Sequence, residues 1–190
     1  MSARLKGGTL LSTMAVVREL NPGPRPDDWI RSCPQETQQL LTRTLLAIEW
    51  VSVDLFAPFL QVLLTQFCQR DEQRFRKLMR AVFKRDFNNT YRMILNTMTG
   101  ALLIPRLPAI WANGFDGGVL KAQVSSSAEN VHRGQVEIRE FVCQSSIYGL
   151  VFDAFLEQLV VQVGARNHLV TRTRESHRDG VYNCDYMLTF

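Results

Sequence analysis

The sequence predicts an α+β fold in which N-terminal helices cover a C-terminal antiparallel sheet. In the first 115 residues, apolar side chains recur mostly at steps of three and four, as in amphipathic helices. Residues 135–143 and 181–190 instead alternate between apolar and polar, which is typical of half-buried strands. An Asp-Gly pair before the last strand indicates a tight reversal. We therefore expect the order β-β-α-β-β for residues 117–190.

The composition fits a single domain over residues 1–190. With 46% hydrophobic and 21% charged residues, a chain of this length can bury a sizeable core. The net charge of +4 is too small an imbalance to indicate a nucleic-acid partner. No apolar run reaches the length of a membrane span, and the N-terminus lacks the apolar core of a signal peptide. We expect a cytoplasmic protein.

The N-terminal part is expected to be helical. Residues 5–20 carry an apolar stripe, which predicts an amphipathic helix within the N-terminal segment 1–20. Residues 21–34 form a proline-rich linker in this interpretation, because proline lacks a backbone donor and restricts the residue before it. Asp27 is expected to cap a short turn in this linker. The main helical part then spans residues 35–115.

Within this helical part, a short helix is expected directly after Pro34. A strongly apolar helix follows over residues 52–69, where Pro58 either kinks the helix or marks its first turn. The clearest helical pattern runs over residues 75–98, with a candidate interruption at 86–89. A last short helix is expected just before the strands begin.

The C-terminal part opens with a strand expected over residues 119–125. A second strand spans residues 135–143, where the alternation changes phase and predicts a bulge near Arg139. A helix that is apolar nearly all round follows from Ser145 to Val163, and Gly164 is a natural helix stop.

Two further strands are expected over residues 169–175 and 181–190. They are joined by a turn at residues 177–180. The last strand places one row of apolar and aromatic side chains on a single face: Tyr182, Cys184, Tyr186, Leu188 and Phe190.

No pattern of catalytic residues stands out, and we expect no enzyme. The sequence contains no phosphate-binding glycine loop and no nucleophile-elbow or zinc-protease motif. Ser176, His177 and Asp179 are near neighbours in one turn and are poorly placed to face one another as a triad requires. The cysteines are widely spaced without a C-x-x-C pair, so we interpret them as reduced structural residues: Cys33, Cys68, Cys143 and Cys184.

Residues 175–186, Glu-Ser-His-Arg-Asp-Gly-Val-Tyr-Asn-Cys-Asp-Tyr, resemble the closing signature of vinyl reductase-type small-molecule-binding domains. Gly180, Cys184 and Tyr186 match that signature. Ser176 stands where its first cysteine would be, which removes the partner that a redox or metal pair with Cys184 would need.

The wider layout resembles an uncharacterised, highly duplicated family of myxobacterial proteins. The similarity includes the opening residues 5–11, Tyr91-Arg92 in mid-chain, and the segment from Pro108 to the Phe115–Gly118 turn. This resemblance implies the fold shared by vinyl reductase-type domains, heme nitric-oxide-binding domains and TRAPP vesicle-tethering subunits.

The heme-binding relatives hold their cofactor with a proximal histidine on a helix and a Tyr-x-Ser-x-Arg pattern. This chain contains no Tyr-x-Ser-x-Arg. Its histidines, His132, His168 and His177, fall in predicted loops or at strand starts, where a solvated side chain is commoner than an axial ligand. We therefore expect no heme or other cofactor and no metal.

A basic stretch between residues 70 and 92 contains eight basic and three acidic residues. Its simplest interpretation is a solvated helix face, and an acidic protein or a polyanion remains the alternative partner. The residues of this candidate basic face are Arg74, Lys77, Arg80, Lys84 and Arg85.

Two functions of different classes fit the sequence. The first is a non-enzymatic protein-interaction or adaptor module in bacterial signalling or assembly, with an unidentified protein partner and a homodimer formed through its N-terminal helices. The alternative is a sensory domain that binds a small apolar ligand between the sheet and the helices. The candidate lining residues, which plain core packing would also explain, are Phe56, Phe59, Phe83, Phe152, Phe155 and Tyr186.

Overall fold

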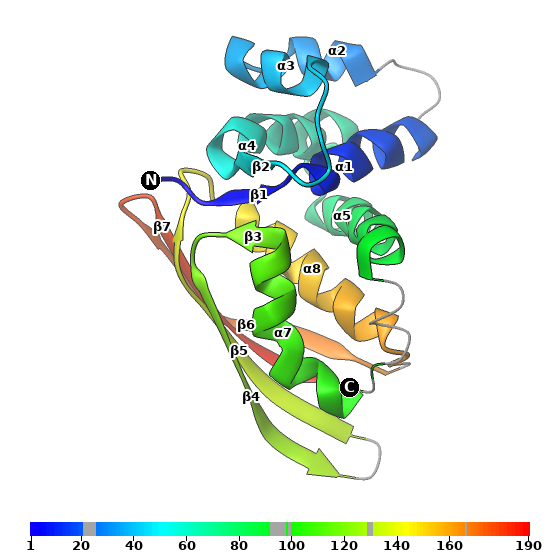
Figure 1. Ribbon diagram of the computed structural model, residues 1–190, viewed down its shortest axis with the longest axis vertical. Helices are drawn as coiled ribbons and strands as arrows, with labels where there is room; N and C mark the ends of the chain where they lie inside the picture. Colours follow the sequence, from blue (N-terminus) through cyan, green and yellow to red (C-terminus); the bar gives the residue numbers. More distant parts are fainter. Residues whose placement is uncertain (21–25, 92–97, 99, 129–130, 166) are drawn as a thin grey trace.

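The computed structural model confirms the α+β class, with antiparallel sheets and helices packed beside them (Figure 1). Figure 1 shows α1 to α4 gathered at one end, while α5, α7 and α8 lie beside the large sheet. The structure describes residues 1–20, 26–91, 98, 100–128, 131–165 and 167–190.

The larger sheet has four antiparallel strands in the order β4-β5-β7-β6. The last strand, β7 (Val181–Thr189), is therefore an inner strand, between β5 (Val131–Val142) and β6 (Leu169–Arg178). The outer strand β4 (Val119–Ala128) pairs with β5. The helix α8 (Tyr148–Gln162) follows β5 along the chain and precedes β6. The alternation in the sequence arises because one face of β7 is buried and the other is partly exposed.

The predicted bulge near Arg139 is confirmed. The pairing of β5 with β7 shifts register between Ile138 and Phe141. Glu140 takes a positive φ of 57°, and its backbone N–H donates to the Asn183 side-chain oxygen at 2.9 Å. This extra residue returns Phe141 to the buried face of the sheet.

The helix α8 is apolar nearly all round because it is covered on two sides. It packs against α5 (Glu72–Asp86) on one side and beside the large sheet on the other (Figure 1). Ser145 and Ser146 were expected to cap this helix, but it begins at Tyr148 with Ile147 at its cap position; the Ser145 hydroxyl still accepts from the Ile147 N–H at 3.3 Å. Gly164, with φ of 86°, follows its C-terminal end.

A second, three-stranded sheet was missed by the sequence analysis. Its strands are β1 (Arg4–Lys6), β2 (Trp50–Ser52) and β3 (Phe115–Asp116), in the order β2-β1-β3. The expectation of a helix from residue 5 was therefore wrong by two residues, because residues 4–6 pair with distant segments. The helix α1 (Gly7–Leu20) starts at a glycine because the Leu46 carbonyl oxygen lies close to it. A Cβ atom at position 7 would be only 2.3 Å from that oxygen.

The segment expected to be a linker is partly helical. Residues 26–31 form α2 (Pro26–Arg31), with a proline at the first helical position, where its missing N–H costs nothing. The remaining linker residues 21–25 lie outside the described residues. The helix α3 (Gln35–Thr42) directly follows Pro34, as expected.

The predicted helix over residues 52–69 consists of α4 (Val53–Val62) and a π-helical turn, η1 (Leu63–Phe67). Pro58 lies inside α4 rather than in its first turn. Gln69 and Arg70 then both take positive φ values, 56° and 63°, and the chain changes direction there before α5 begins.

The long pattern over residues 75–98 divides at the candidate interruption. The helix α5 ends at Asp86, and a second π-helical turn, η2 (Phe87–Tyr91), continues it. Residues 92–97 lie outside the described residues. The next helix, α7 (Gly100–Gly114), starts earlier than the expected residue 105 and includes Pro105 and Pro108.

Within the described residues, no helix combines the length and the apolar character that crossing a membrane requires. All four cysteines are buried and have free thiols. Burial raises the pKa of Cys33 to about 11 and that of Cys143 to about 12, so these thiols stay protonated at neutral pH.

Candidate ligand-binding cavity

A cavity of about 410 Å³ lies where the end of α5, the end of α7, the start of α1 and α8 come together. The loop before β2 contributes to its rim with Ala47 and Ile48. Most of its wall is apolar, and a few lining side chains are polar. The lining residues are Lys6, Thr9, Ala47, Ile48, Phe83, Asp86, Phe87, Ile110, Asn113, Gly114, Phe115 and Phe155.

Four phenylalanine rings form the aromatic part of the wall. Phe155 of α8 packs edge-on against Phe83 of α5, with ring centroids 5.3 Å apart, and against Phe115 of β3 at 5.6 Å. It also contacts Phe87 of η2 at 5.8 Å. All four rings are at most 5% exposed, so this part of the wall is aromatic and buried.

One polar group of the cavity wall is the carboxyl group of Asp86, the last residue of α5. The Thr9 hydroxyl of α1 donates to Asp86 Oδ2 at 2.8 Å, and the Ser12 hydroxyl donates to Oδ1. Burial raises the pKa of Asp86, while these two hydrogen bonds and the charge of Arg85 act in the opposite direction. Asp86 thus joins α5 to α1 and places a carboxyl group at the cavity.

The positive groups beside the cavity are already bound within the chain. Lys6 Nζ donates to the Ile48 carbonyl at 3.0 Å and lies 3.7 Å from the centroid of the Trp50 ring. The first two amides of α1, at Gly7 and Gly8, donate to the carbonyls of the loop at 2.9 and 3.0 Å. The loop carbonyls therefore satisfy two of the N-terminal amides that a helix would otherwise offer to an anion.

Of the six candidate lining residues from the sequence, Phe83 and Phe155 line this cavity. Phe56 and Phe59 instead pack near each other on α4, with ring centroids 6.1 Å apart. Phe152 is also absent from the described cavity wall and belongs to the neighbouring aromatic core.

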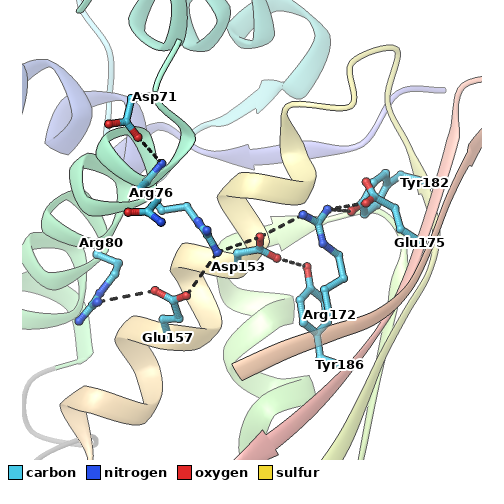
Figure 2. Close-up of polar contacts among 10 residues, drawn as sticks. Asp71, Arg76, Arg80, Asp153, Glu157, Arg172, Glu175, Tyr182 and Tyr186 are labelled. Atoms are coloured by element: carbon cyan, nitrogen blue, oxygen red, sulfur yellow. Dashed lines mark hydrogen bonds and ion pairs between the residues drawn. The ribbon is translucent and has the colours of Figure 1, made fainter. Parts of the chain in front are cut away.

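Tyr186 takes part in a buried polar network rather than in the cavity (Figure 2). Its hydroxyl donates at 3.0 Å to Asp153, a carboxylate of α8 that is only 5% exposed. Arg172 of β6 donates to the same carboxylate at 3.1 Å, and also to Glu175 at 2.7 Å and to the Tyr182 hydroxyl at 3.2 Å. Burial raises the pKa of Asp153, and the charge of Arg172 opposes this shift most strongly.

The same network extends to α5. Arg76 Nη1 lies 3.8 Å from Asp153 Oδ2 and 3.9 Å from Glu157 Oε1, and Arg80 Nη1 lies 3.6 Å from Glu157 Oε2 (Figure 2). Because Arg172 belongs to the large sheet, the network connects the sheet through α8 to α5. Its members from α5 and α8 share these helices with the cavity phenylalanines.

The candidate basic face is largely neutralised by the chain itself. Arg74 lies 3.6 Å from Asp71, and Arg80 belongs to the network above. Arg85 lies 2.5 Å from Glu19 of α1. Lys77 and Lys84 are exposed and form no ion pair with a described residue.

Sequence reasoning missed Asp86, Thr9, Phe87 and Phe115 as lining residues. A signal existed for Asp86 and Phe87, because both lie in the candidate interruption of the long helical pattern, and π-helical turns are frequent at functional sites. No local signal marks Thr9, since its partner Asp86 lies 77 positions away.

None of the chain's three histidines lines the cavity. His177 Nε2 lies 2.8 Å from the Cys143 carbonyl, and the His132 ring packs 5.8 Å from that of Phe190. His168 precedes β6. Among the described residues, no group of three His, Cys, Asp or Glu side chains is arranged to hold a metal ion.

No protein-family model and no curated protein sequence matches the chain. Solved structures of H-NOX domains do, each over 98% of this chain. An oxygen-binding H-NOX domain related to soluble guanylate cyclases, in its oxygen complex, has 12% identity, 95% coverage of its own chain and a TM-score of 0.66. An H-NOX variant carrying 4-cyano-L-phenylalanine has 12% identity, 96% coverage and a TM-score of 0.69. A mutant H-NOX of T. tengcongensis has 11% identity, 97% coverage and a TM-score of 0.58.

Several of these H-NOX structures address heme and its distortion, so the fit of heme to this cavity can be tested on its residues. Neither a histidine nor a cysteine is among the described lining residues, and Lys6 is engaged elsewhere. The residues present therefore do not fit a heme whose iron needs such a ligand. The likeness to H-NOX confirms the fold implied by the resemblance, whereas kinship with myxobacterial or vinyl reductase-type proteins remains a prediction. This chain has the fold of the H-NOX domains.

Proposed function

We propose that this chain is a sensory domain that binds a small, mainly apolar molecule in the cavity between α5, α7, α8 and β3. The observation that carries the proposal is that Phe155 packs against the other phenylalanines around a space of about 410 Å³ without filling it. Small-molecule sites in proteins have volumes of about 300 to 1,000 Å³ and mostly apolar walls with few polar groups. The lining of this cavity follows that pattern.

The buried network gives such a sensor a route from the cavity to the sheet. Phe83 and Arg80 lie one turn apart on α5, and Phe155 belongs to the same helix, α8, as Asp153 and Glu157. A ligand that moves α5 relative to α8 would change the distances from Arg76 and Arg80 to their carboxylates. This coupling needs no chemical step, in keeping with our expectation of a non-enzymatic protein.

The adaptor hypothesis receives less support than this alternative. Among the described residues, the large exposed apolar side chains are spread over different elements and loops, for example Leu20, Leu46, Leu102 and Leu169. A protein-binding face would instead gather such side chains in one contiguous patch. A homodimer and a protein partner remain predictions.

Gly114 offers a direct test, because it lines the cavity at the end of α7. A Cβ added there would meet no heavy atom within 4 Å outside its own helix backbone and chain neighbours, and Gly114 does not have a positive φ. Gly114→Leu should fill part of the cavity while the fold is kept, since replacing a helical glycine usually stabilises.

The binding of Nile red, a neutral apolar dye, is the measurement. We expect the unmodified chain to bind the dye, and we expect Gly114→Leu to weaken binding by about tenfold or more, equivalent to about 1.4 kcal/mol. Gly114→Ala, which adds one methyl group, is the matched control and should bind nearly as well. Equal binding by all three proteins, or none by the unmodified chain, would contradict the proposal, with thermal melting to verify that each is folded.

A further inference from the structure

We infer that the ligand of this cavity is a protonated primary amine on an apolar body, with its ammonium group bound to Asp86. The inference rests on the proposed function and specifies the chemistry of its ligand. Three features of the cavity support it: a carboxyl group that forms no ion pair with a described residue, aromatic rings beside it, and positive groups that are already occupied.

Asp86 has hydrogen-bonding capacity to spare. A carboxylate offers about four acceptor positions, of which the Thr9 and Ser12 hydroxyls use two. Within the described part of the chain, Asp86 forms no ion pair, and the adjacent Arg85 is turned to Glu19 at 2.5 Å. Asp86 is half-buried, and a carboxylate that has lost part of its water is costly without a cation, so an ammonium ligand would relieve that cost through a charge-assisted hydrogen bond.

The surrounding rings suit a cation as well as its apolar body. Phe83 and Phe87 flank Asp86 in sequence and line the same cavity, and Phe155 packs against both. The face of an aromatic ring attracts a cation, most strongly where water is excluded. Gly114, the last residue of α7, also lines the wall, so the negative end of that helix dipole lies at the cavity.

An anionic ligand fits less well, although a lysine is among the lining residues. The Lys6 ammonium is held by the Ile48 carbonyl and the Trp50 ring. The first two amides of α1 are bonded to loop carbonyls. An anion would therefore have to displace internal contacts and would lie beside the carboxyl group of Asp86.

The simpler role of Asp86 is a tie between α5 and α1 through its two hydroxyl partners. Asp86→Asn separates the two roles, because an amide keeps the size of the side chain and can still bond to Thr9 and Ser12, yet carries no charge. Thr9→Val is the complementary variant. It weakens the tie and leaves the charge in place.

Isothermal titration of the full chain at neutral pH with three matched probes tests the inference: phenylbutylamine, phenylbutanol and phenylbutyrate. We expect the amine to bind about tenfold tighter than the alcohol, which corresponds to one charge-assisted hydrogen bond. Phenylbutyrate should bind weakest. Asp86→Asn should remove the preference for the amine without weakening the alcohol, whereas Thr9→Val should keep the preference.

The outcomes separate this inference from the proposed function. If the alcohol or the butyrate binds as tightly as the amine, or if Asp86→Asn keeps the preference, the amine assignment is wrong while the cavity remains a binding site. If none of the three probes binds and Nile red also fails, both proposals are overturned.

Discussion

Asp86 shares its cavity with four phenylalanines, and burial raises the pKa of its carboxyl group above the ordinary 3.8. The folded chain therefore holds this proton to a higher pH than the unfolded chain does. As the pH rises through the folded-state pKa, ionisation costs stability, and below about pH 3.8 this cost is absent. In the absence of a ligand, the charge that would bind an amine thus lowers the free energy of unfolding.

Asp86→Asn should accordingly be at least as stable as the unmodified chain at neutral pH, because asparagine cannot ionise. The difference in the free energy of unfolding should shrink in acid, where Asp86 is protonated in both states. Urea unfolding of both proteins at several pH values measures this difference. If Asp86→Asn is less stable than the unmodified chain at neutral pH, and this difference becomes smaller in acid, the ionised carboxyl group stabilises the fold.

Among the elements, β7 is the strand on which the large sheet depends. Leu188 is fully buried on its inner face and pairs with Gly134 of β5 and Val170 of β6. Leu188→Asp places a charge in the core and should lower the free energy of unfolding by on the order of 4 kcal/mol.

Met187→Asp is the control on the opposite, partly exposed face of the same strand, and its cost should be about 1 kcal/mol. Urea unfolding compares the two variants. If both variants lose a similar free energy of unfolding, the two faces of β7 do not differ in burial, and the position of β7 inside the sheet is wrong.

The elements that the sequence predicted are those whose own residues carry the pattern. Strand β7 alternates because one face is buried, and α8 is apolar all round because two layers cover it. Strand β1 escaped prediction because Leu5 is in a strand only through its pairing with Val51 and Phe115, which lie far along the chain. Three-residue strands are too short for a periodic signal.

The candidate site was predictable only in part, for a related reason. Phe83 and Phe155 line the cavity while Phe56 and Phe59 fill the core, yet all four are large apolar side chains in helices. Periodicity identifies a buried face without saying whether the space beside it is filled. That distinction depends on how distant elements pack.

At the scale of the whole molecule, the buried network holds the helices to the sheet. Arg172 is the main cation for Asp153, and its loss would leave that carboxylate with Arg76 at 3.8 Å. Arg172→Met should lower the free energy of unfolding by about 3 kcal/mol, because the buried Asp153 carboxylate would keep only the more distant Arg76 and the Tyr186 hydroxyl as partners.

Arg174→Met provides the control, since Arg174 lies on the same strand but is exposed. Its effect should stay within about 0.5 kcal/mol. Chemical denaturation of both variants tests the difference. Equal stability of the two would indicate that the network contributes nothing to holding the layers together.

The cavity is assembled from segments near residues 6–9, 47–48, 83–87, 110–115 and 155. During synthesis, its wall cannot close until α8 has been made, long after α1 has left the ribosome. Contacts between segments so far apart in the chain form slowly, because the entropy cost of closing the long loop between them comes before the contact can stabilise the fold. A molecule that fills the cavity therefore contacts segments that are joined only late in folding. We expect its binding to slow unfolding rather than to speed folding.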